Sequence, residues 1–318
     1  MSRVIVVGAG LSGLACARRL GELRPDLDVQ VVDKGRGVGG RMATRRMGDA
    51  RFDHGAQFFT TRSADFSSLI ADAVGAGAVV EWSRGFEAEP DGYPRWCGAD
   101  GMTSLAKWMV ASADLDVDLG NTVVDLREDP ADAFVITAPI PQAMAVLSFS
   151  HFLPPPPMAA ELAALTYKPT IAIMVRLDAS PSGFADHGGV QLADHPALGF
   201  IADNERKGVS PVPAVTIHLS NALSGELWTS TDEVVLARAL TEAAAFVELG
   251  EPAETQIQRW RYAGPVDCQR ERTVSWTAGP GGAGPVIALA GEIFGGPKVE
   301  GAYLSGCAAA ESVAAALA

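Results

Sequence analysis

Residues 4–13 read VIVVGAGLSG, and residues 29–33 read VQVVD. The first run is apolar and then carries three glycines in a Gly-x-Gly-x-x-Gly turn. Residues 14–20 have the composition of a helix, and the second run is apolar and ends in an acid. This order predicts a strand, a tight turn, a helix and a second strand, which is the α/β unit that binds dinucleotides. An α/β unit with a glycine-rich turn and no ligand is the alternative.

Each glycine of this turn has a separate expected purpose. Gly8 permits the tight turn, Gly10 lets the backbone approach a pyrophosphate, and Gly13 lets the helix pack closely on the strand. The helix N-terminus offers free N–H groups to the phosphates. Asp33 lies 20 residues after Gly13, where an acid accepts hydrogen bonds from an adenosine ribose. The spacing therefore predicts a dinucleotide site.

A second glycine-rich segment follows at once, where residues 34–42 read KGRGVGGRM. Four glycines within six residues exclude a regular element and allow close backbone approach to a ligand. Arg41 follows them and is a natural partner for phosphate. Residues 52–59 are aromatic-rich with a polar centre, in which Gln57 either faces a ligand or caps a strand.

Composition and charge limit the class of protein. The chain has 318 residues, 48% apolar and 20% charged, which predicts a soluble globular protein of about two domains. A net charge of −13 disfavours nucleic acids and anionic membranes as partners. The four cysteines form no Cys-x-x-Cys pair, and we expect free thiols, no metal site and a cytoplasmic location. The sequence leaves the oligomeric state open.

Periodicity predicts the remaining elements. We expect helices over 64–74 and 103–111, a strand over 79–82, a strand pair or one long strand over 117–126, and a buried strand over 133–139. Four prolines at 154–157 predict a stiff, extended crossing between domains.

The second half of the chain changes character. Residues 170–177, 190–192, 198–202 and 214–219 predict an antiparallel sheet, followed by an amphipathic helix over 231–247 and a strand over 257–262. An apolar strand then returns at 286–291, followed by Glu292 and an alanine-rich helix over 303–316. The fold class predicted is α/β.

Taken together, these segments resemble the two-dinucleotide-binding-domain flavoproteins of the amine oxidase type. Their order is the early glycine fingerprint, then Gly-Gly-Arg at 39–41, then strand, Gly291, Glu292 and a helix near the C-terminus. Within that superfamily the chain resembles the renalase family, particularly its bacterial members. The narrower matches are residues 39–42, 55–60, 95–102, 259–263 and 299–306.

The resemblance implies a Rossmann-like FAD domain and a discontinuous substrate domain with an antiparallel sheet and helices. It implies residues 1–70, 97–147 and 270–318 for the first, and 71–96 and 148–269 for the second. FAD is expected to bind non-covalently, because no Ser-Gly-Gly-Cys-Tyr segment is present. The implied cofactor-binding residues are Gly8, Gly10, Gly13, Asp33, Lys34, Gly40, Arg41, Ala56, Gln57, Met102, Val123, Glu292, Glu300, Gly301 and Ala302.

Three features depart from the family pattern. Glu292 stands where many relatives have Asp, and Phe58 or Phe59 stands where they often have Tyr. The loop between Val124 and Phe134 is shorter than in relatives, which usually carry an extra hairpin there. The short loop concerns how that side of the FAD domain is covered and not the cofactor itself. Together with Phe58 and Phe59, it leaves open whether the activity is altered or lost.

Renalase-like enzymes oxidise isomeric dihydronicotinamide dinucleotides, the 2- and 6-dihydro forms, to NAD(P)+, and O2 becomes hydrogen peroxide. Hydride passes to flavin N5 and no general base is strictly needed. The implied catalytic residues are His218, Gln57 and Asn204. His218 either hydrogen-bonds the substrate carboxamide or the flavin edge, or is a buried histidine satisfied by backbone. Trp260 is expected in the core.

Two other functions stay open. One is an amine oxidase or desaturase acting on a small amine or apolar substrate. An amine would need an aromatic cage, for which the six Trp and four Tyr offer few candidates beyond Trp96 and Tyr303. The other is an FAD-binding relative that has lost its chemistry.

Overall fold

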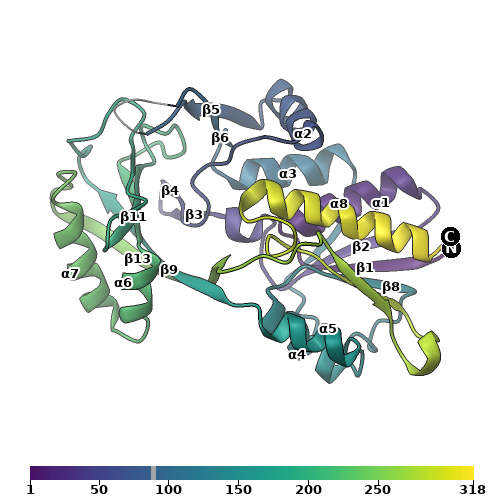
Figure 1. The fold of residues 1–318 in the computed structure, drawn as a ribbon. Coiled ribbons are helices and arrows are strands. Elements are labelled where there is room, and N and C mark those ends of the chain that lie inside the picture. The colour runs from purple at the N-terminus through teal and green to yellow at the C-terminus, as the bar shows by residue number, and fades with distance from the viewer. Residues whose placement is uncertain (87–90) are drawn as a thin grey trace.

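A parallel sheet with helices on both faces forms the larger half of the protein (Figure 1). The computed structural model describes residues 1–86 and 91–318. Within them, a six-stranded sheet has the order β14-β15-β8-β1-β2-β7, in which β14 alone runs antiparallel to its neighbour. Its strands are β14 (Val274–Thr277), β15 (Val286–Leu289), β8 (Ala133–Ile136), β1 (Arg3–Val7), β2 (Asp28–Asp33) and β7 (Asp116–Leu119).

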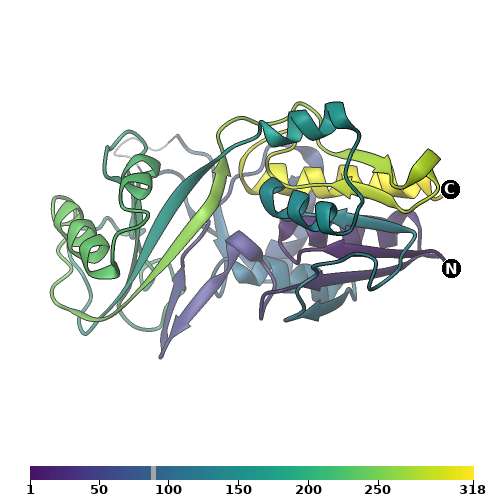
Figure 2. The ribbon, with the colours of Figure 1, turned by 90° about the horizontal axis from the view of Figure 1, so that it is seen from below.

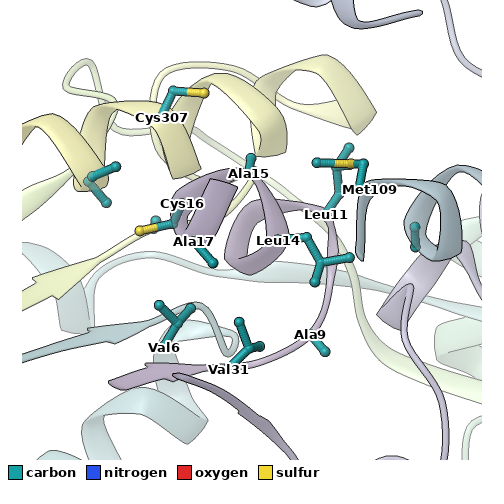
Figure 3. Packing of buried hydrophobic residues seen from close by; sticks show 14 of the residues in the cluster. Val6, Ala9, Leu11, Leu14, Ala15, Cys16, Ala17, Val31, Met109 and Cys307 are labelled. Carbon is teal, nitrogen blue, oxygen red and sulfur yellow. The ribbon is translucent and has the colours of Figure 1, made fainter. Parts of the chain in front are cut away.

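Helix α1 (Leu11–Leu23) is packed between this sheet and the C-terminal helix α8 (Lys298–Ala316). Figure 3 shows Leu14 and Ala17 of α1 directed toward Val6 and Val31 of the sheet, with Cys307 of α8 above. Helices α2 (Ala64–Gly75) and α3 (Thr103–Ser112) add to the same hydrophobic cluster. Segments from the two ends of the sequence therefore share one core.

The opposite face of the sheet is covered by α4 (Ile140–Phe149) and α5 (Pro156–Ala163). The prediction of an extended linker at residues 154–157 is wrong in part, because Pro156 begins α5. Proline fits the first turn of a helix, since the N–H that it lacks has no partner there. Leu162 of α5 packs with Ile5 and Phe134 of the parallel sheet.

An antiparallel sheet forms the smaller half. Its order is β10-β11-β12-β9-β13, and α6 (Asn221–Glu226) and α7 (Asp232–Ala243) cover one face. The strands are β10 (Gly189–Gln191), β11 (Leu198–Asp203), β12 (Ala214–Leu219), β9 (Tyr167–Leu177) and β13 (Pro252–Pro265). The long strands β9 and β13 run side by side from one half to the other (Figure 2).

Two hairpins complete the fold, β3–β4 (Thr44–Met47 and Ala50–Asp53) and β5–β6 (Val79–Ser83 and Arg95–Gly98). The prediction of a long strand or strand pair over 117–126 is wrong beyond Leu119. Gly120 has a left-handed φ of +82°, and the Asn121 side chain donates to Asp118, so the chain turns away there.

The structure also bears on membrane-spanning helices, the cysteines and the domain division. In the part of the chain that the structure describes, no helix has the length and apolar character needed to span a bilayer. The four cysteines are free thiols, and Cys16, Cys97 and Cys307 are buried. The predicted division into two domains stays a prediction, and its segment 71–96 includes residues 87–90, which lie outside the described residues.

Candidate functional site

The glycines of the first turn differ in what surrounds them. Gly8 has φ +118°, and a Cβ there would collide with the Thr137 side chain. A Cβ on Gly13 would collide with the carbonyl oxygen of Gly8. A Cβ on Gly10 would meet nothing within 4 Å. Gly8 and Gly13 are therefore required by the fold, whereas Gly10 borders open space at the start of α1, where a pyrophosphate needs room.

Asp33 ties this turn to the following loop. One carboxylate oxygen accepts from the Ala9 N–H and the other from the Gly35 N–H, each at 2.6 Å. Each oxygen retains a further lone pair that a ribose hydroxyl can use. The acid is held at the end of β2 in the place that its sequence spacing predicts.

The second glycine segment lies directly on the first. The Gly39 N–H donates to the Ala9 carbonyl at 2.8 Å, and a Cβ on Gly40 would lie 3.3 Å from the Gly10 Cα. Residues 34–42 and the first turn therefore form one cradle rather than two sites.

Ser12 adds a residue that the sequence reasoning missed. It lies in the first turn of α1, it is 5% exposed, and its hydroxyl has no hydrogen-bond partner within residues 1–86 and 91–318. A buried hydroxyl without a partner at a helix N-terminus fits a phosphate oxygen as acceptor. The signal was its position between the second and third glycines of the fingerprint.

Arg41 and Glu292 close the cradle from opposite ends of the sequence. Their side chains form a two-point ion pair, and Arg41 also donates to the Tyr262 carbonyl at 3.0 Å. The Glu292 side chain is only 9% exposed. The pair brings the segment after β2 against the segment after β15, as a cofactor that spans both would require.

The other cofactor candidates lie around this pair. The Ala56 N–H donates to the Arg41 carbonyl at 2.9 Å. One Glu300 oxygen accepts from the Arg62 and Ser63 N–H groups at 3.2 and 2.6 Å, at the start of α2. The contacts of all the candidate residues with a cofactor stay predictions. Lys34 is exposed, Met102 is fully buried, and Val123, Gly301 and Ala302 are half-buried.

A row of side chains crosses the face of the antiparallel sheet that α6 and α7 leave free. Phe200, His218, Ala172 and Gln258 stand opposite one another on β11, β12, β9 and β13. Because residues directly opposite in a sheet share one face, these four side chains are neighbours. Trp260, two positions after Gln258, lies on the same face.

His54 covers this row. Its carbonyl accepts from the Trp260 indole at 2.8 Å and lies 3.3 Å from His218 Nε2. The His54 and Trp260 rings are stacked, with centroids 5.3 Å apart and an interplanar angle of 8°. Trp260 is half-buried against His54. The expectation that it lies in the core is therefore wrong.

The two histidines are neutral at pH 7. Burial lowers the pKa of His54 to about 4, with a smaller contribution from the nearby Arg45 cation. Burial likewise lowers the pKa of His218 to about 4. The neutral ring of His218 donates through Nε2 and can accept through Nδ1.

Arg45 supplies a positive charge near His54. Its guanidinium donates to Gln258 Oε1 at 2.8 Å, and the residue is half-buried on β3. Among the described residues, no carboxylate lies within ion-pair distance of it. A half-buried guanidinium without a counterion is suited to an anionic ligand.

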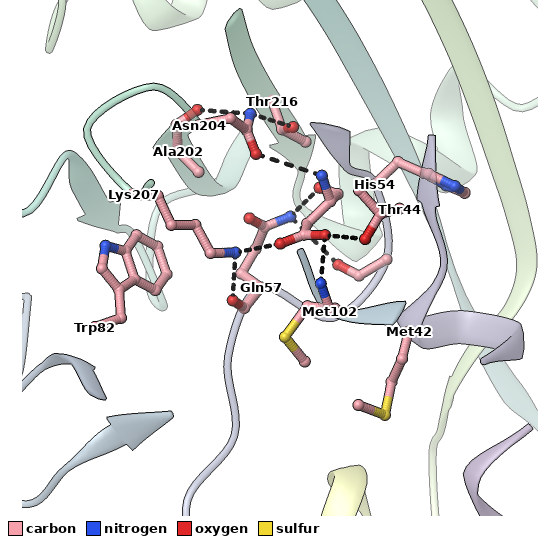
Figure 4. Close-up of polar contacts among 12 residues, drawn as sticks. Met42, Thr44, His54, Gln57, Trp82, Met102, Ala202, Asn204, Lys207 and Thr216 are labelled. Carbon is pink, nitrogen blue, oxygen red and sulfur yellow. Dashed lines mark hydrogen bonds and ion pairs between the residues drawn. The ribbon is translucent and has the colours of Figure 1, made fainter. Parts of the chain in front are cut away.

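Gln57 and Asn204 belong to a network around a buried ion pair (Figure 4). Lys207 Nζ lies 2.7 Å from Asp53 Oδ2, and both side chains are fully buried. Asn204 donates to Thr216 Oγ1 at 3.0 Å and accepts from the Asp53 N–H at 3.3 Å. Both ends of the Asn204 amide contact protein, and its predicted contact with substrate stays a prediction.

Comparison with known proteins identifies the class. Residues 6–73 match the NAD(P)-binding Rossmann-like domain. Residues 102–314, more than half of the chain, match the flavin containing amine oxidoreductase family. The chain belongs to that family, and the predicted FAD-dependent oxidoreductase is confirmed as its enzyme class.

Solved structures with the same fold have low sequence identity. A putative protoporphyrinogen oxidase from Exiguobacterium sp. 255-15 is 15% identical over 99% of both chains, with a TM-score of 0.72. Cyclohexylamine oxidase from Brevibacterium oxydans IH-35A is 14% identical over 99% of both chains, with a TM-score of 0.64. The PF1083 protein from Pyrococcus furiosus is 12% identical over 98% of this chain and 97% of that chain, with a TM-score of 0.63. They confirm the predicted fold class.

Proposed function

We propose that this flavoenzyme is a renalase-type oxidase that binds FAD non-covalently and oxidises isomeric dihydronicotinamide dinucleotides to NAD(P)+. The observation that carries the substrate class is Arg45, a half-buried cation without a carboxylate partner among the described residues. It lies near the neutral His54 and donates to Gln258, which belongs to the same row of the antiparallel sheet as His218. A nucleotide brings a phosphate to such a cation, whereas a protonated amine is repelled by it.

The residues of the cradle fit FAD. Gly10 leaves room for the pyrophosphate, Ser12 offers a buried hydroxyl, and Asp33 retains acceptor capacity for the adenosine ribose. Arg41 and Glu292 would hold the phosphates and the ribitol. When bound, the flavin would accept a hydride at N5 and would then reduce O2 to hydrogen peroxide.

The chain's own residues then bind and orient the substrate. A dihydropyridine donates hydride without a general base, so two neutral histidines suit the reaction. His218 can hydrogen-bond a carboxamide. Two strand spacings of about 4.8 Å separate His218 from Gln258 in the row. A nicotinamide ring near His218 would therefore place its ribose phosphate toward Arg45.

The aromatic residues of the substrate side argue against a small amine. Phe58, Trp82, Phe86 and Phe200 form a cluster with ring centroids 4.7–6.4 Å apart. However, Lys207 Nζ already lies 4.5 Å from the Trp82 centroid, and Arg95 lies 5.8 Å from that of Phe58. These rings hold the protein's own cations.

Among the described residues, the two aromatic residues that the sequence suggested for an amine cage make no ring contact with this cluster. Tyr303 packs on Phe66, with centroids 5.1 Å apart. The Trp96 backbone pairs with that of Phe59. An amine oxidase or desaturase stays the alternative reaction.

The test is anaerobic mixing of the yellow enzyme with NADH isomers made by borohydride reduction of NAD+. Bleaching of the flavin by the isomers but not by ordinary NADH is expected. If both are equally inert, the substrate assignment fails, and rapid bleaching by a small amine would support the alternative. A purified protein that is colourless and takes up no FAD would indicate a relative without chemistry. The cytoplasmic location stays a prediction.

A further inference from the structure

The fully buried ion pair of Lys207 and Asp53 connects the two halves of the protein (Figure 4). Lys207 lies in the turn between β11 and β12, and Asp53 ends β4. The other carboxylate oxygen of Asp53 accepts from Thr44 Oγ1 at 2.6 Å and from the Met102 N–H at 2.8 Å. Every charge in this network therefore has a partner, and its geometry is tightly determined.

This pair also holds Gln57 at two points. Lys207 Nζ donates to the Gln57 carbonyl at 2.6 Å, and Gln57 Nε2 donates to the Asp53 carbonyl. The Trp82 ring lies on the third side of the ammonium. Lys207 thus has no donor left for a ligand, and its effect on a ligand has to pass through Gln57.

The remaining polar atom of Gln57 has no partner. Its Oε1 is buried and makes no hydrogen bond within the described ranges, and the residue is 6% exposed. Because Nε2 is bound to the Asp53 carbonyl, exchanging the two ends of the amide would place oxygen against oxygen. A buried acceptor without a donor is unfavourable, so it points to a donor on a ligand.

The position of Gln57 indicates which ligand. Its neighbour Ala56 contacts Arg41 in the cofactor cradle, whereas Gln57 itself is held by Lys207 from the substrate sheet. We propose that Lys207 and Asp53 are positioning residues that hold Gln57 so that Oε1 accepts a hydrogen bond from the carboxamide N–H of a bound nicotinamide. This inference rests on the proposed function and adds to it how the amide is recognised.

The experiment compares two ligands of the FAD-loaded enzyme, NAD+ and its 3-acetylpyridine analogue, in which a methyl ketone replaces the carboxamide and removes its N–H donors. Dissociation constants are measured from the change in the flavin absorbance spectrum. The native enzyme is expected to bind NAD+ about tenfold more tightly than the analogue. Gln57→Leu is expected to bind the two ligands equally.

The positioning pair is tested by the double variant Lys207→Met with Asp53→Asn. Removing both charges avoids the buried unpaired carboxylate that Lys207→Met alone would leave. The double variant is expected to lose most of the preference for NAD+ and to keep its FAD. Lys168→Met, the same change at an exposed lysine of β9, is the control and should keep the full preference.

Equal binding of the two ligands by the native enzyme would overturn this inference and leave the proposed function intact. It is also overturned if Gln57→Leu keeps the preference, or if that variant only alters the flavin spectrum of the ligand-free enzyme. If neither dinucleotide binds at all, the proposed function fails and this inference fails with it.

Discussion

At the scale of single residues, the proposed binding of an anionic substrate can be tested at Arg45. Arg45→Gln should raise KM for an isomeric dihydro-NAD about 10- to 100-fold, which corresponds to loss of one charged hydrogen-bonded contact. The turnover number should change less, because a phosphate far from the reacting ring is bound equally before and during reaction. Steady-state kinetics under air measure both.

Arg46 is the matched control for this prediction. It is the next residue of β3, it is exposed, and it points to the opposite side of the hairpin. Arg46→Gln should leave KM within about twofold of the native value, as surface changes of this kind are small. Equal effects of the two variants would mean that Arg45 contributes general charge and does not bind a phosphate.

The burial of His54 predicts a loss of stability in mild acid. Burial lowers the pKa of His54 from 6.5 to about 4, so the unfolded chain binds more protons between these values. Stability is therefore fully present above pH 6.5 and is lost as pH falls toward 4. For His54 alone, the loss from pH 7 to pH 5 is about 2 kcal/mol.

Urea unfolding at pH 7 and pH 5 measures that loss. In His54→Gln the difference between the two pH values should shrink by about 2 kcal/mol, whatever the variant costs at pH 7. His151→Gln, at an exposed histidine, should leave the difference unchanged. An unchanged difference in His54→Gln would show that His54 is hydrated and titrates normally.

Residues differ in how far the sequence could predict them. Gly8, Gly13 and Asp33 act within a local unit of fixed spacing, so their places followed from the pattern. The partners Lys207 and Asp53 are 154 positions apart, and no local pattern relates them. Without that pair, Gln57 could not be assigned either as a ligand contact or as a cap, because its orientation depends on Lys207.

At the scale of elements, the β1–α1 unit contains a glycine that the fold requires, Gly13, and one that we propose leaves room for the pyrophosphate, Gly10. Gly13→Ala should fail to fold or be strongly destabilised, because its Cβ would collide with the Gly8 carbonyl. Gly10→Ala should fold normally, since its backbone is extended and no atom lies within 4 Å of the new Cβ. The same methyl would occupy the space left for the pyrophosphate, so the variant should purify without colour.

Circular dichroism measures folding, and the absorbance of the purified protein measures bound flavin. A folded and yellow Gly10→Ala protein would contradict the assignment of this space to the pyrophosphate. A folded and stable Gly13→Ala protein would show that α1 can move away from β1. The two variants carry the same chemical change, so their difference reports only on position.

Periodicity predicted well the elements whose apolar residues follow one continuous pattern and are buried, such as β1, α1 and β8. The errors arose where a local signal competes with packing. Apolar residues around 123–126 resemble a strand, but Gly120 turns the chain before them. The prolines at 154–157 suggest an extended linker, but Leu162 gives α5 a buried contact that stabilises a short helix.

At the scale of the whole molecule, the cofactor cradle joins segments from both ends of the chain. Arg41 follows β2, and Glu292 follows β15, while α1 and α8 pack on each other. β9 and β13 run from the second sheet to the larger half (Figure 2), and the Tyr262 carbonyl of β13 accepts from Arg41. Binding of one ligand across these segments is therefore expected to stabilise the whole fold rather than one half.

Loading with FAD should raise the unfolding temperature of the apoprotein in a single cooperative transition. A ligand at about 100 times its dissociation constant stabilises the native state by about 2.7 kcal/mol. FMN should have a much smaller effect, because it lacks the adenosine that we propose Asp33 and the β1–α1 turn bind. Thermal unfolding followed by circular dichroism, with FAD, FMN or neither, measures the three cases.

The same protein tests the non-covalent attachment. Acid precipitation should leave the yellow colour in the supernatant, because no bond to a side chain would hold it in the pellet. Colour retained in the pellet would contradict non-covalent binding. Equal stabilisation by FMN and FAD would contradict the proposed contact between adenosine and the cradle. Two separate transitions would show that the two halves unfold independently even when they share the ligand.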